Sequence, residues 1–412
     1  MLKEIELLLI AFILCISTVF AQSPTHTINI NQSYEIGAIY NMTGRYSTID
    51  RPSAEGAIVA VDAINKQGGL LGRQVKLVLR DSKGDESLEK KIATEFAKDP
   101  NVNIMIGLNS TREVSDVAPI LAAAHKIIIT TGATSFGLVQ QVPHYLFFIC
   151  FSNNVQAAAA AEYVFEFLYK KSGAIFYDET RQYATELYQY FSERLKELGG
   201  EIVLTQTFAH DNYNIDKQIK ALKALPKEPE FIYLAAGPTE GPAIIKQLRD
   251  AGYQGLIVGG DAFTAKKLLS VLGDTANNIT YTTHGVINPE FTNLLPALMR
   301  QYLATQNFFK VFQDYYHRLP ESVYAALGYD AVNLIAAAIN RGQSFEVENI
   351  IKALHHLDPF VGVTGKISYV NGQTVPIKTV SIIQIENGKP SFIGNWIPVK
   401  VPEYKEPSSN NN

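Results

Sequence analysis

Cysteine is almost absent from this chain, which has two cysteines among 412 residues. Cys15 lies in the apolar run near the start, so Cys150 is the single cysteine of residues 22–412. That part of the chain cannot form an intramolecular disulfide, and we interpret Cys150 as a small buried apolar residue. The fold must therefore depend on hydrophobic cores, which a chain of this length can bury.

An excess of charge of one sign is also absent. The chain has 36 Lys and Arg against 40 Asp and Glu, for a net charge of −4 at pH 7. Nucleic acids and anionic membrane surfaces attract proteins with basic patches. We therefore expect no nucleic-acid partner.

No apolar run reaches the roughly 20 residues that span a bilayer. The run at residues 7–20 has 14 residues and ends in Val19-Phe20-Ala21, with small residues at the two positions that a signal peptidase reads. We expect residues 1–21 to be a cleaved secretory signal, with an uncleaved anchor as the alternative. The remainder should be soluble, and the polar residues 403–412 should be a disordered tail.

The short motifs of common catalytic and cofactor sites are missing as well. The sequence has no phosphate loop, no G-x-G-x-x-G after a strand, and no H-E-x-x-H, C-x-x-C or G-x-S-x-G spacing. The adjacent His355 and His356 cannot put both rings on one helix face. We therefore expect no enzyme, no cofactor and no metal site.

What the chain does contain is a regular alternation of short apolar runs and helical patterns. The expected strands are 35–40, 75–80, 103–106, 127–131, 174–177, 201–205, 231–235, 256–259 and 380–385. The expected helices are 53–66, 87–98, 112–124, 155–170, 181–197, 215–225, 240–251, 322–340 and 346–355. This alternation predicts an α/β fold with parallel sheets flanked by helices on both faces. Residues 75–131 and 201–259 repeat the same plan, which predicts two such sheets.

Residues 54–81 combine a helix, a glycine stop and a strand. Gly68 or Gly69 can take the left-handed conformation that closes a helix, and the following extended run ends at Asp81. The diagnostic positions are Gly56, Ala60, Ile64-Asn65, Gly68-Gly69, Gly72, Leu77 and Asp81. In this spacing the segment resembles the type I periplasmic solute-binding proteins, in particular the leucine/isoleucine/valine-binding family of ABC transporters.

The resemblance implies two Rossmann-like lobes joined by three crossovers. We expect lobe 1 to comprise residues 34–151 and 285–359, and lobe 2 to comprise residues 152–284 and 360–398. No proline- or serine-rich linker separates the two halves, which agrees with direct crossovers.

Two turns that follow expected strands of lobe 1 have the composition of an anion site. Ser110 and Thr111 come where a helix begins, and Gly132 and Thr134 lie in the next turn along the chain. Ligands of parallel sheets bind beyond the carboxyl ends of strands, and free amides at a helix N-terminus suit a carboxylate. The alternative for each turn is a plain helix cap or turn.

The resemblance implies a role for each of these turns. In leucine-binding-like proteins they hold the α-carboxylate of an amino acid, which implies that Ser110 or Thr111, together with Gly132 and Thr134, does so here. It also implies that Asp261 accepts the ligand's ammonium, a charge-assisted hydrogen bond. The alternative for Asp261 is the N-cap of a helix at residues 264–272.

Other candidate residues concern the remainder of the pocket. Tyr183 matches an aromatic that faces the cleft in the family, with an ordinary helix residue as the alternative, and Tyr46 lies near the place of another pocket aromatic. The chain departs from the family at Gly237-Pro238-Thr239, where an aromatic is frequent. Arg45 near the cleft would favour a more acidic ligand.

Together these features indicate an extracytoplasmic substrate-binding protein of an ABC transporter. It would capture a small amino acid, branched-chain or related, between two lobes in the periplasm and deliver it as a monomer to a membrane permease. The alternatives are a ligand sensor with the same fold, or a binder of amides, urea or small carboxylates. An α/β hydrolase would need a nucleophile and base or a metal cluster, and the sequence offers neither.

Overall fold

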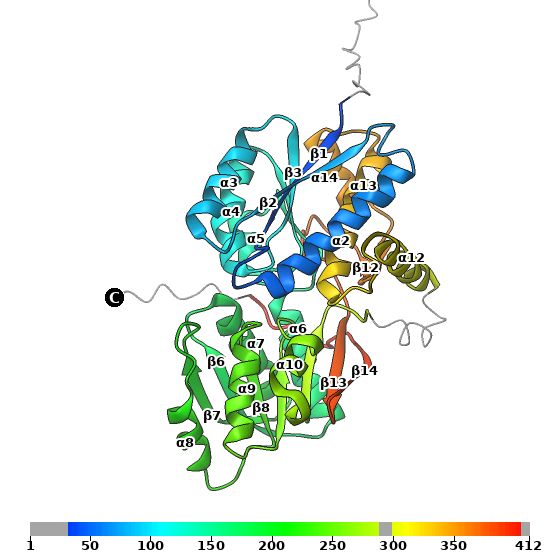
Figure 1. The fold of residues 1–412 in the computed structure, drawn as a ribbon. Coiled ribbons are helices and arrows are strands. Elements are labelled where there is room, and N and C mark those ends of the chain that lie inside the picture. The colour runs from blue at the N-terminus through cyan, green and yellow to red at the C-terminus, as the bar shows by residue number, and fades with distance from the viewer. Residues whose placement is uncertain (1–31, 288–298, 405–412) are drawn as a thin grey trace, which may run out of the picture.

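The computed structural model describes residues 32–287 and 299–404. The expected signal sequence and residues 405–412 of the expected tail lie outside these ranges. Two α/β lobes are stacked one above the other, the first mainly blue, cyan and orange and the second mainly green (Figure 1). Each lobe is built around its own sheet and its own buried core.

The sheet of the first lobe has five parallel strands in the order β2-β1-β3-β4-β5. These are β1 (Tyr34–Tyr40), β2 (Val75–Asp81), β3 (Val102–Gly107), β4 (Ile127–Thr130) and β5 (Leu146–Phe148). The helices are α2 (Ser47–Lys66), α3 (Glu86–Lys98), α4 (Thr111–Ala123), α5 (Gly137–Gln141), α12 (Met299–Tyr316), α13 (Val323–Gly342) and α14 (Val347–His355). Figure 1 shows α3 and α4 on one face, and α2 and α13 on the other. Because β2 and β3 lie on opposite sides of β1, the strand order reverses between β1 and β3.

The sheet of the second lobe has seven strands in the order β14-β13-β10-β9-β8-β6-β7. These are β6 (Ser172–Asp178), β7 (Glu201–Phe208), β8 (Phe231–Ala235), β9 (Leu256–Gly259), β10 (Ile279–Thr283), β13 (Val380–Glu386) and β14 (Lys389–Trp396). The helices are α6 (Asn153–Glu162), α7 (Gln182–Glu197), α8 (Asp216–Lys223), α9 (Glu240–Asp250) and α10 (Ala265–Leu272), with a short 3₁₀ turn at Gly273–Thr275. The order reverses between β6 and β8. Strand β13 pairs antiparallel with both β10 and β14, so one edge of this sheet is not parallel.

The predicted α/β fold is confirmed, and each expected strand and helix has a counterpart whose ends shift by a few residues. One expected helix, residues 155–170, is α-helical only to Glu162 and continues as a π-helical turn at Tyr163–Phe167. Helix α12 and strands β5, β10 and β14 were not expected. Strand β5 is only three residues long, which is short for recognition by periodicity.

Glycine allows helices α2 and α13 to cross at close range. A Cβ atom on Gly56 would lie 1.7 Å from the carbonyl oxygen of Ala325, and one on Gly328 would lie 1.9 Å from that of Ser53. Both distances are far below any real carbon–oxygen contact, so each position requires glycine. Gly56 of the sequence motif thus serves packing within the first lobe.

Cys150 and the apolar helix α13 both belong to the hydrophobic core of the first lobe. Cys150 is fully buried and free, and burial raises the pKa of its thiol. Helix α13 is the one helix of the described residues long and apolar enough to cross a membrane, but it is mostly buried inside the protein. It is therefore the central helix of the first lobe.

The chain passes into the second lobe for the last time later than expected. Val363, Ile367 and Val375 are buried in the core of the first lobe, beside a two-stranded sheet of β11 (Phe360–Gly362) and β12 (Gly365–Ile367). Lys378 Nζ donates to the carbonyl of Ile149 at 2.7 Å. Residues 360–378, which the expected division gave to lobe 2, therefore pack with lobe 1.

Candidate functional site

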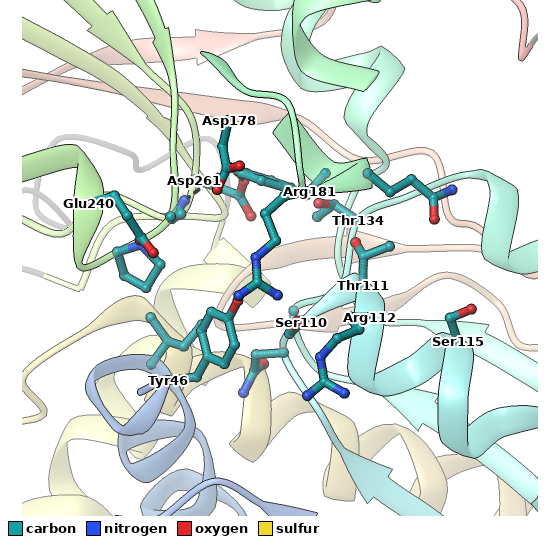
Figure 2. Close-up of a pocket in the computed structure, with 18 of the residues that line it drawn as sticks. Tyr46, Ser110, Thr111, Arg112, Ser115, Thr134, Asp178, Arg181, Glu240 and Asp261 are labelled. Atoms are coloured by element: carbon teal, nitrogen blue, oxygen red, sulfur yellow. Dashed lines mark hydrogen bonds between the residues drawn. The ribbon is translucent and has the colours of Figure 1, made fainter. Parts of the chain in front are cut away.

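A cavity of about 260 Å³ lies between the two lobes, at the carboxyl ends of the strands of both sheets. The seven residues expected from the sequence all line it: Tyr46, Ser110, Thr111, Gly132, Thr134, Tyr183 and Asp261. Tyr46, Ser110, Thr111 and Tyr183 follow the strands between which the strand order reverses, and Gly132, Thr134 and Asp261 follow the neighbouring strands β4 and β9. Open α/β sheets bind their ligands at this edge. Figure 2 shows Ser110, Thr111 and Thr134 on one side of the cavity, with Asp178, Asp261 and Glu240 across from them.

The first wall is the turn from β3 into α4. Leu108 has a φ of +58°, which turns the chain sharply after the strand. Ser110 then occupies the N-cap position of α4 in an extended conformation, and its side chain makes no capping hydrogen bond. The amides of the first turn of α4 therefore keep their donors and the positive end of the helix dipole for a ligand.

The buried carboxyl group of Asp50 stabilises this turn through hydrogen bonds. Asp50 accepts hydrogen bonds from Asn109 Nδ2 at 2.6 Å and from the amide of Asn41 at 2.7 Å. Burial, the largest cause, raises the pKa of Asp50 to about 7. Its hydrogen bond keeps Asn109 beside the cavity.

The turn after β4 forms the second wall. Thr130 Oγ1 donates to the Leu108 carbonyl at 2.9 Å and accepts from the Ala133 amide at 3.0 Å, which joins the two turns. A Cβ atom on Gly132 would lie 2.4 Å from Asn109 Oδ1, so this position requires glycine. The Thr134 hydroxyl is buried and has no partner among the described residues. Buried polar groups are normally hydrogen-bonded, and this one lines the cavity.

Asp261 lies on the facing wall, in the loop after β9. Its Oδ1 accepts from Gln156 Nε2 and from the Tyr183 hydroxyl, both at 2.8 Å, and its Oδ2 lies 2.8 Å from His284 Nε2. Desolvation, the largest cause, lowers the pKa of the buried His284, which favours its neutral form. Among the described residues, Asp261 therefore has no lysine or arginine partner.

The competing interpretation of Asp261 as a helix cap is excluded. Helix α10 begins at Ala265, and Thr264 is its N-cap, with a side chain that accepts from the amide of Lys267 at 3.3 Å. Asp261 lies three residues before that cap and turns toward the cavity instead.

Tyr183 and Tyr46 close the cavity from opposite lobes. Besides its bond to Asp261, the Tyr183 hydroxyl accepts from the amide of Ala262 at 3.4 Å, and burial raises its pKa. Tyr46 precedes α2, and the guanidinium carbon of Arg181 lies 5.8 Å from its ring centroid. This geometry is that of a cation–π contact.

Arg45 does not have the role expected for it. Its Nη2 lies 3.1 Å from Glu240 Oε1 and donates to the carbonyl of His210 at 2.5 Å. The charge of Arg45 is therefore compensated by a buried carboxylate of the second lobe, so Arg45 gives no reason to expect an acidic ligand.

Further contacts join the lobes across the cleft. Ser135 Oγ donates to Glu186 Oε1 at 2.5 Å, and the hydroxyl of Tyr324 donates to the carbonyl of Asp261 at 3.1 Å. At the rim, Lys266 Nζ lies 2.7 Å from Glu321 Oε2. The described arrangement is thus a closed one.

Sequence reasoning missed Gln156, His284 and Tyr324, which surround Asp261. Gln156 lies 105 positions before Asp261 in the chain, and no local pattern reports a contact at that separation. The only signal was polar side chains within apolar segments. His284 follows the short strand β10, and Tyr324 is the second residue of the apolar helix α13.

The sequence and the fold both match known proteins. Residues 33–390 match the family model described as periplasmic binding protein. The chain is 25% identical over 359 residues to Leu/Ile/Val-binding protein homolog 3 of Brucella melitensis, covering 86% of this chain and 92% of that protein. It is likewise 25% identical over 359 residues to Leu/Ile/Val-binding protein BraC3 of Rhizobium johnstonii, with the same coverage.

Two solved structures resemble it along most of the chain. The branched-chain amino acid transporter substrate-binding protein LivJ of Streptococcus pneumoniae, in complex with isoleucine, has a TM-score of 0.78 at 25% identity. The leucine-binding protein LivK of Thermotoga maritima has a TM-score of 0.77 at 26% identity. Each comparison covers 88% of this chain and 99% of the other. These relatives are named as binding proteins and not as enzymes.

Proposed function

Because the chain belongs to the periplasmic binding protein family, we propose that it is the extracytoplasmic substrate-binding protein of an ABC transporter. It captures a small α-amino acid, branched-chain or related, in the cavity between its lobes. As a monomer in the periplasm it then presents the closed, loaded form to a membrane permease. The names of its relatives support this proposal, since they are described as Leu/Ile/Val-binding and transporter proteins.

One observation carries the proposal. The N-terminus of α4, which has no side-chain cap, and the Thr134 hydroxyl, which has no partner in the part of the chain that the structure describes, lie on one wall of a cavity. Its other wall presents Asp261. A helix N-terminus and a hydroxyl suit a carboxylate, and a carboxylate suits an ammonium. An α-amino acid has both groups on one carbon atom, so it can contact both walls together.

Each group of the ligand has a defined receptor in this proposal. Ser110, Thr111 and the amide of Gly132 receive the α-carboxylate, and Thr134 bonds it or the ammonium. Asp261 accepts the ammonium, and Tyr183 orients Asp261 through its 2.8 Å hydrogen bond. No lysine or arginine among the described residues pairs with Asp261, so its negative charge matches one ammonium.

Domain closure explains how capture works. The carboxylate receptor belongs to lobe 1 and the ammonium receptor to lobe 2, so only the closed form contacts both ends of the ligand. A ligand that binds the closed form better shifts the population of lobe arrangements toward it. The contacts that join the lobes without ligand, such as Arg45 with Glu240, lower the additional energy that closure needs.

The test is a thermal-shift screen of residues 22–412 against α-amino acids, their amino-free carboxylic analogues, simple amides and urea. A ligand at 100 times its dissociation constant stabilises the folded state by about 2.7 kcal/mol, which a melting curve resolves. We expect an α-amino acid to raise the melting temperature and its amino-free analogue to fail. A shift produced only by ligands without an amino group would contradict the proposal.

A matched pair of variants tests the site itself. Thr134 and Thr374 are both buried, and both have a hydroxyl with no partner among the described residues, but only Thr134 lines the cavity. Thr134→Val should weaken amino-acid binding by about tenfold, the equivalent of one hydrogen bond of roughly 1–1.5 kcal/mol. Thr374→Val should leave binding unchanged. Equal behaviour of the two variants would remove Thr134 from the site.

A further inference from the structure

One end of the cavity remains without an assigned ligand group once the two receptors of the proposed function are occupied. This end is formed by Tyr46, Gly237 and Pro238 together with Asp178, the last residue of β6, and Arg181, which lies in the loop after β6. We infer that it receives an amino-acid side chain with a neutral carboxamide or closely similar ureido group, bound between Asp178 and Arg181. This inference rests on the proposed function and specifies its ligand class.

Asp178 supplies an acceptor. It ends strand β6 and is 1% exposed. Its Oδ1 accepts from the amide of Thr180 at 2.9 Å and from the hydroxyl of Thr180 at 2.5 Å. Its Oδ2 is buried and has no hydrogen-bond partner among the described residues. A buried carboxylate oxygen without a donor is rare, and this residue lines the cavity.

Arg181 supplies donors. Figure 2 shows its side chain extending across the cavity toward Tyr46 and Ser110. The guanidinium carbon lies 5.8 Å from the ring centroid of Tyr46, and within the described residues no carboxylate or carbonyl group is bonded to the guanidinium. A guanidinium has five N–H donors in a rigid planar arrangement. The Tyr46 ring holds that plane in place while its donors stay available to a ligand.

The charges at this end are balanced, which selects a neutral group. Arg45 compensates Glu240, and Arg112 compensates Asp116 at the rim, where their side chains are 2.8 Å apart. What remains is the single negative charge of Asp178 and the single positive charge of Arg181. An acidic ligand side chain would be repelled by the negative charge of Asp178, because no proton lies between the two carboxylates. A basic ligand side chain would be repelled by the positive charge of Arg181.

The hydrogen-bonding capacity selects a polar group. A carboxamide has an N–H₂ group for Asp178 Oδ2 and an oxygen for the guanidinium of Arg181. A leucine, isoleucine or valine side chain offers neither, so it would leave the buried Oδ2 of Asp178 and the guanidinium of Arg181 without a ligand partner. Sites built to hydrogen-bond a ligand group discriminate strongly against analogues that lack it.

The experiment is calorimetric titration of the wild type with leucine, glutamine, asparagine, glutamate and lysine. We expect glutamine or asparagine to bind at least about tenfold more tightly than the other three. Tightest binding by leucine, glutamate or lysine would overturn the inference while the proposed function stands. Binding of neither glutamine nor asparagine would also overturn the inference, and the proposed function would then be decided by the wider thermal-shift screen.

Two variants assign the effect to the named groups. Asp178→Asn keeps the acceptor for Thr180 but turns Oδ2 into a donor and removes its charge, so preference should shift from glutamine toward glutamate. Arg181→Met should cost glutamine about tenfold and leave leucine almost unchanged. The control Glu179→Gln removes the same charge from the exposed neighbour of Asp178 and should retain the wild-type preference. An Asp178→Asn protein that behaves as this control would overturn the role of Asp178.

Discussion

Replacing Asp261 with asparagine would test the ammonium receptor with little change of shape. A carboxylate offers about four lone-pair positions, and three are occupied by Gln156, Tyr183 and His284. One position on Oδ2 remains for the ligand. The ammonium should therefore form one charge-assisted hydrogen bond here, which contributes about 1.5–3 kcal/mol.

That free energy converts directly to affinity. At about 1.4 kcal/mol per factor of ten, Asp261→Asn should weaken amino-acid binding by roughly 10- to 150-fold. The fold should survive, because the asparagine oxygen can replace Oδ1 as the acceptor for Gln156 and Tyr183. Its N–H₂ group can donate to His284, whose ring can move its proton to Nδ1.

Calorimetry with two ligands measures the contact between Asp261 and the ligand's ammonium separately from the other contacts. The amino acid that stabilises the wild type most strongly is compared with its α-hydroxy acid counterpart, in both the wild type and Asp261→Asn. The wild type should prefer the amino acid strongly and the variant should not, so the coupling free energy of the cycle measures this contact. An unchanged preference in a variant that melts like the wild type would refute the assignment of Asp261.

Two further predictions concern packing and pH. Gly56→Ala should lower the free energy of unfolding by about 1–3 kcal/mol or more, because its Cβ would lie 1.7 Å from a carbonyl oxygen. Gly394→Ala, where a Cβ meets nothing within 4 Å, should be nearly neutral in the same urea titration, and equal effects would contradict the packing argument. Burial lowers the pKa of His284, so its contribution to stability is complete above the unfolded-state pKa of about 6.5 and is lost as pH falls through the folded-state value. The difference in unfolding free energy between the wild type and His284→Gln should therefore shrink from about pH 7.5 to about pH 5, and a difference that stays constant would show that His284 is not buried in its neutral form.

Local sequence patterns were sufficient for much of this protein. Helices and strands follow from hydrophobic periodicity and from glycine stops such as Gly68 and Gly69, whose positive φ values are those of a helix closed by left-handed residues. Candidate residues such as Ser110, Thr134 and Asp261 were identified because they follow strand ends, and parallel strands bring their carboxyl ends to one edge. These are properties of short segments, which the order of residues determines by itself.

Other features depend on residues far apart in the chain, so tertiary structure decided them. Strands β13 and β14 form an antiparallel edge of the second sheet, and residues 360–378 pack on lobe 1. Both arrangements depend on which apolar surfaces remain uncovered after the sheets have formed. The surroundings of Asp261 come from Gln156 and His284, 105 positions before it and 23 after it.

The same holds for the charges at the cavity. Arg45 and Arg181 are both basic residues near the expected cleft. The structure pairs Arg45 with Glu240, whereas the guanidinium of Arg181 lies over the Tyr46 ring and has no carboxylate partner among the described residues. The sequence by itself determined that this chain is a two-lobed binding protein of a known family. Which side chain its ligand carries depends on which charges are already compensated, and that is settled by contacts between lobes that no local pattern records.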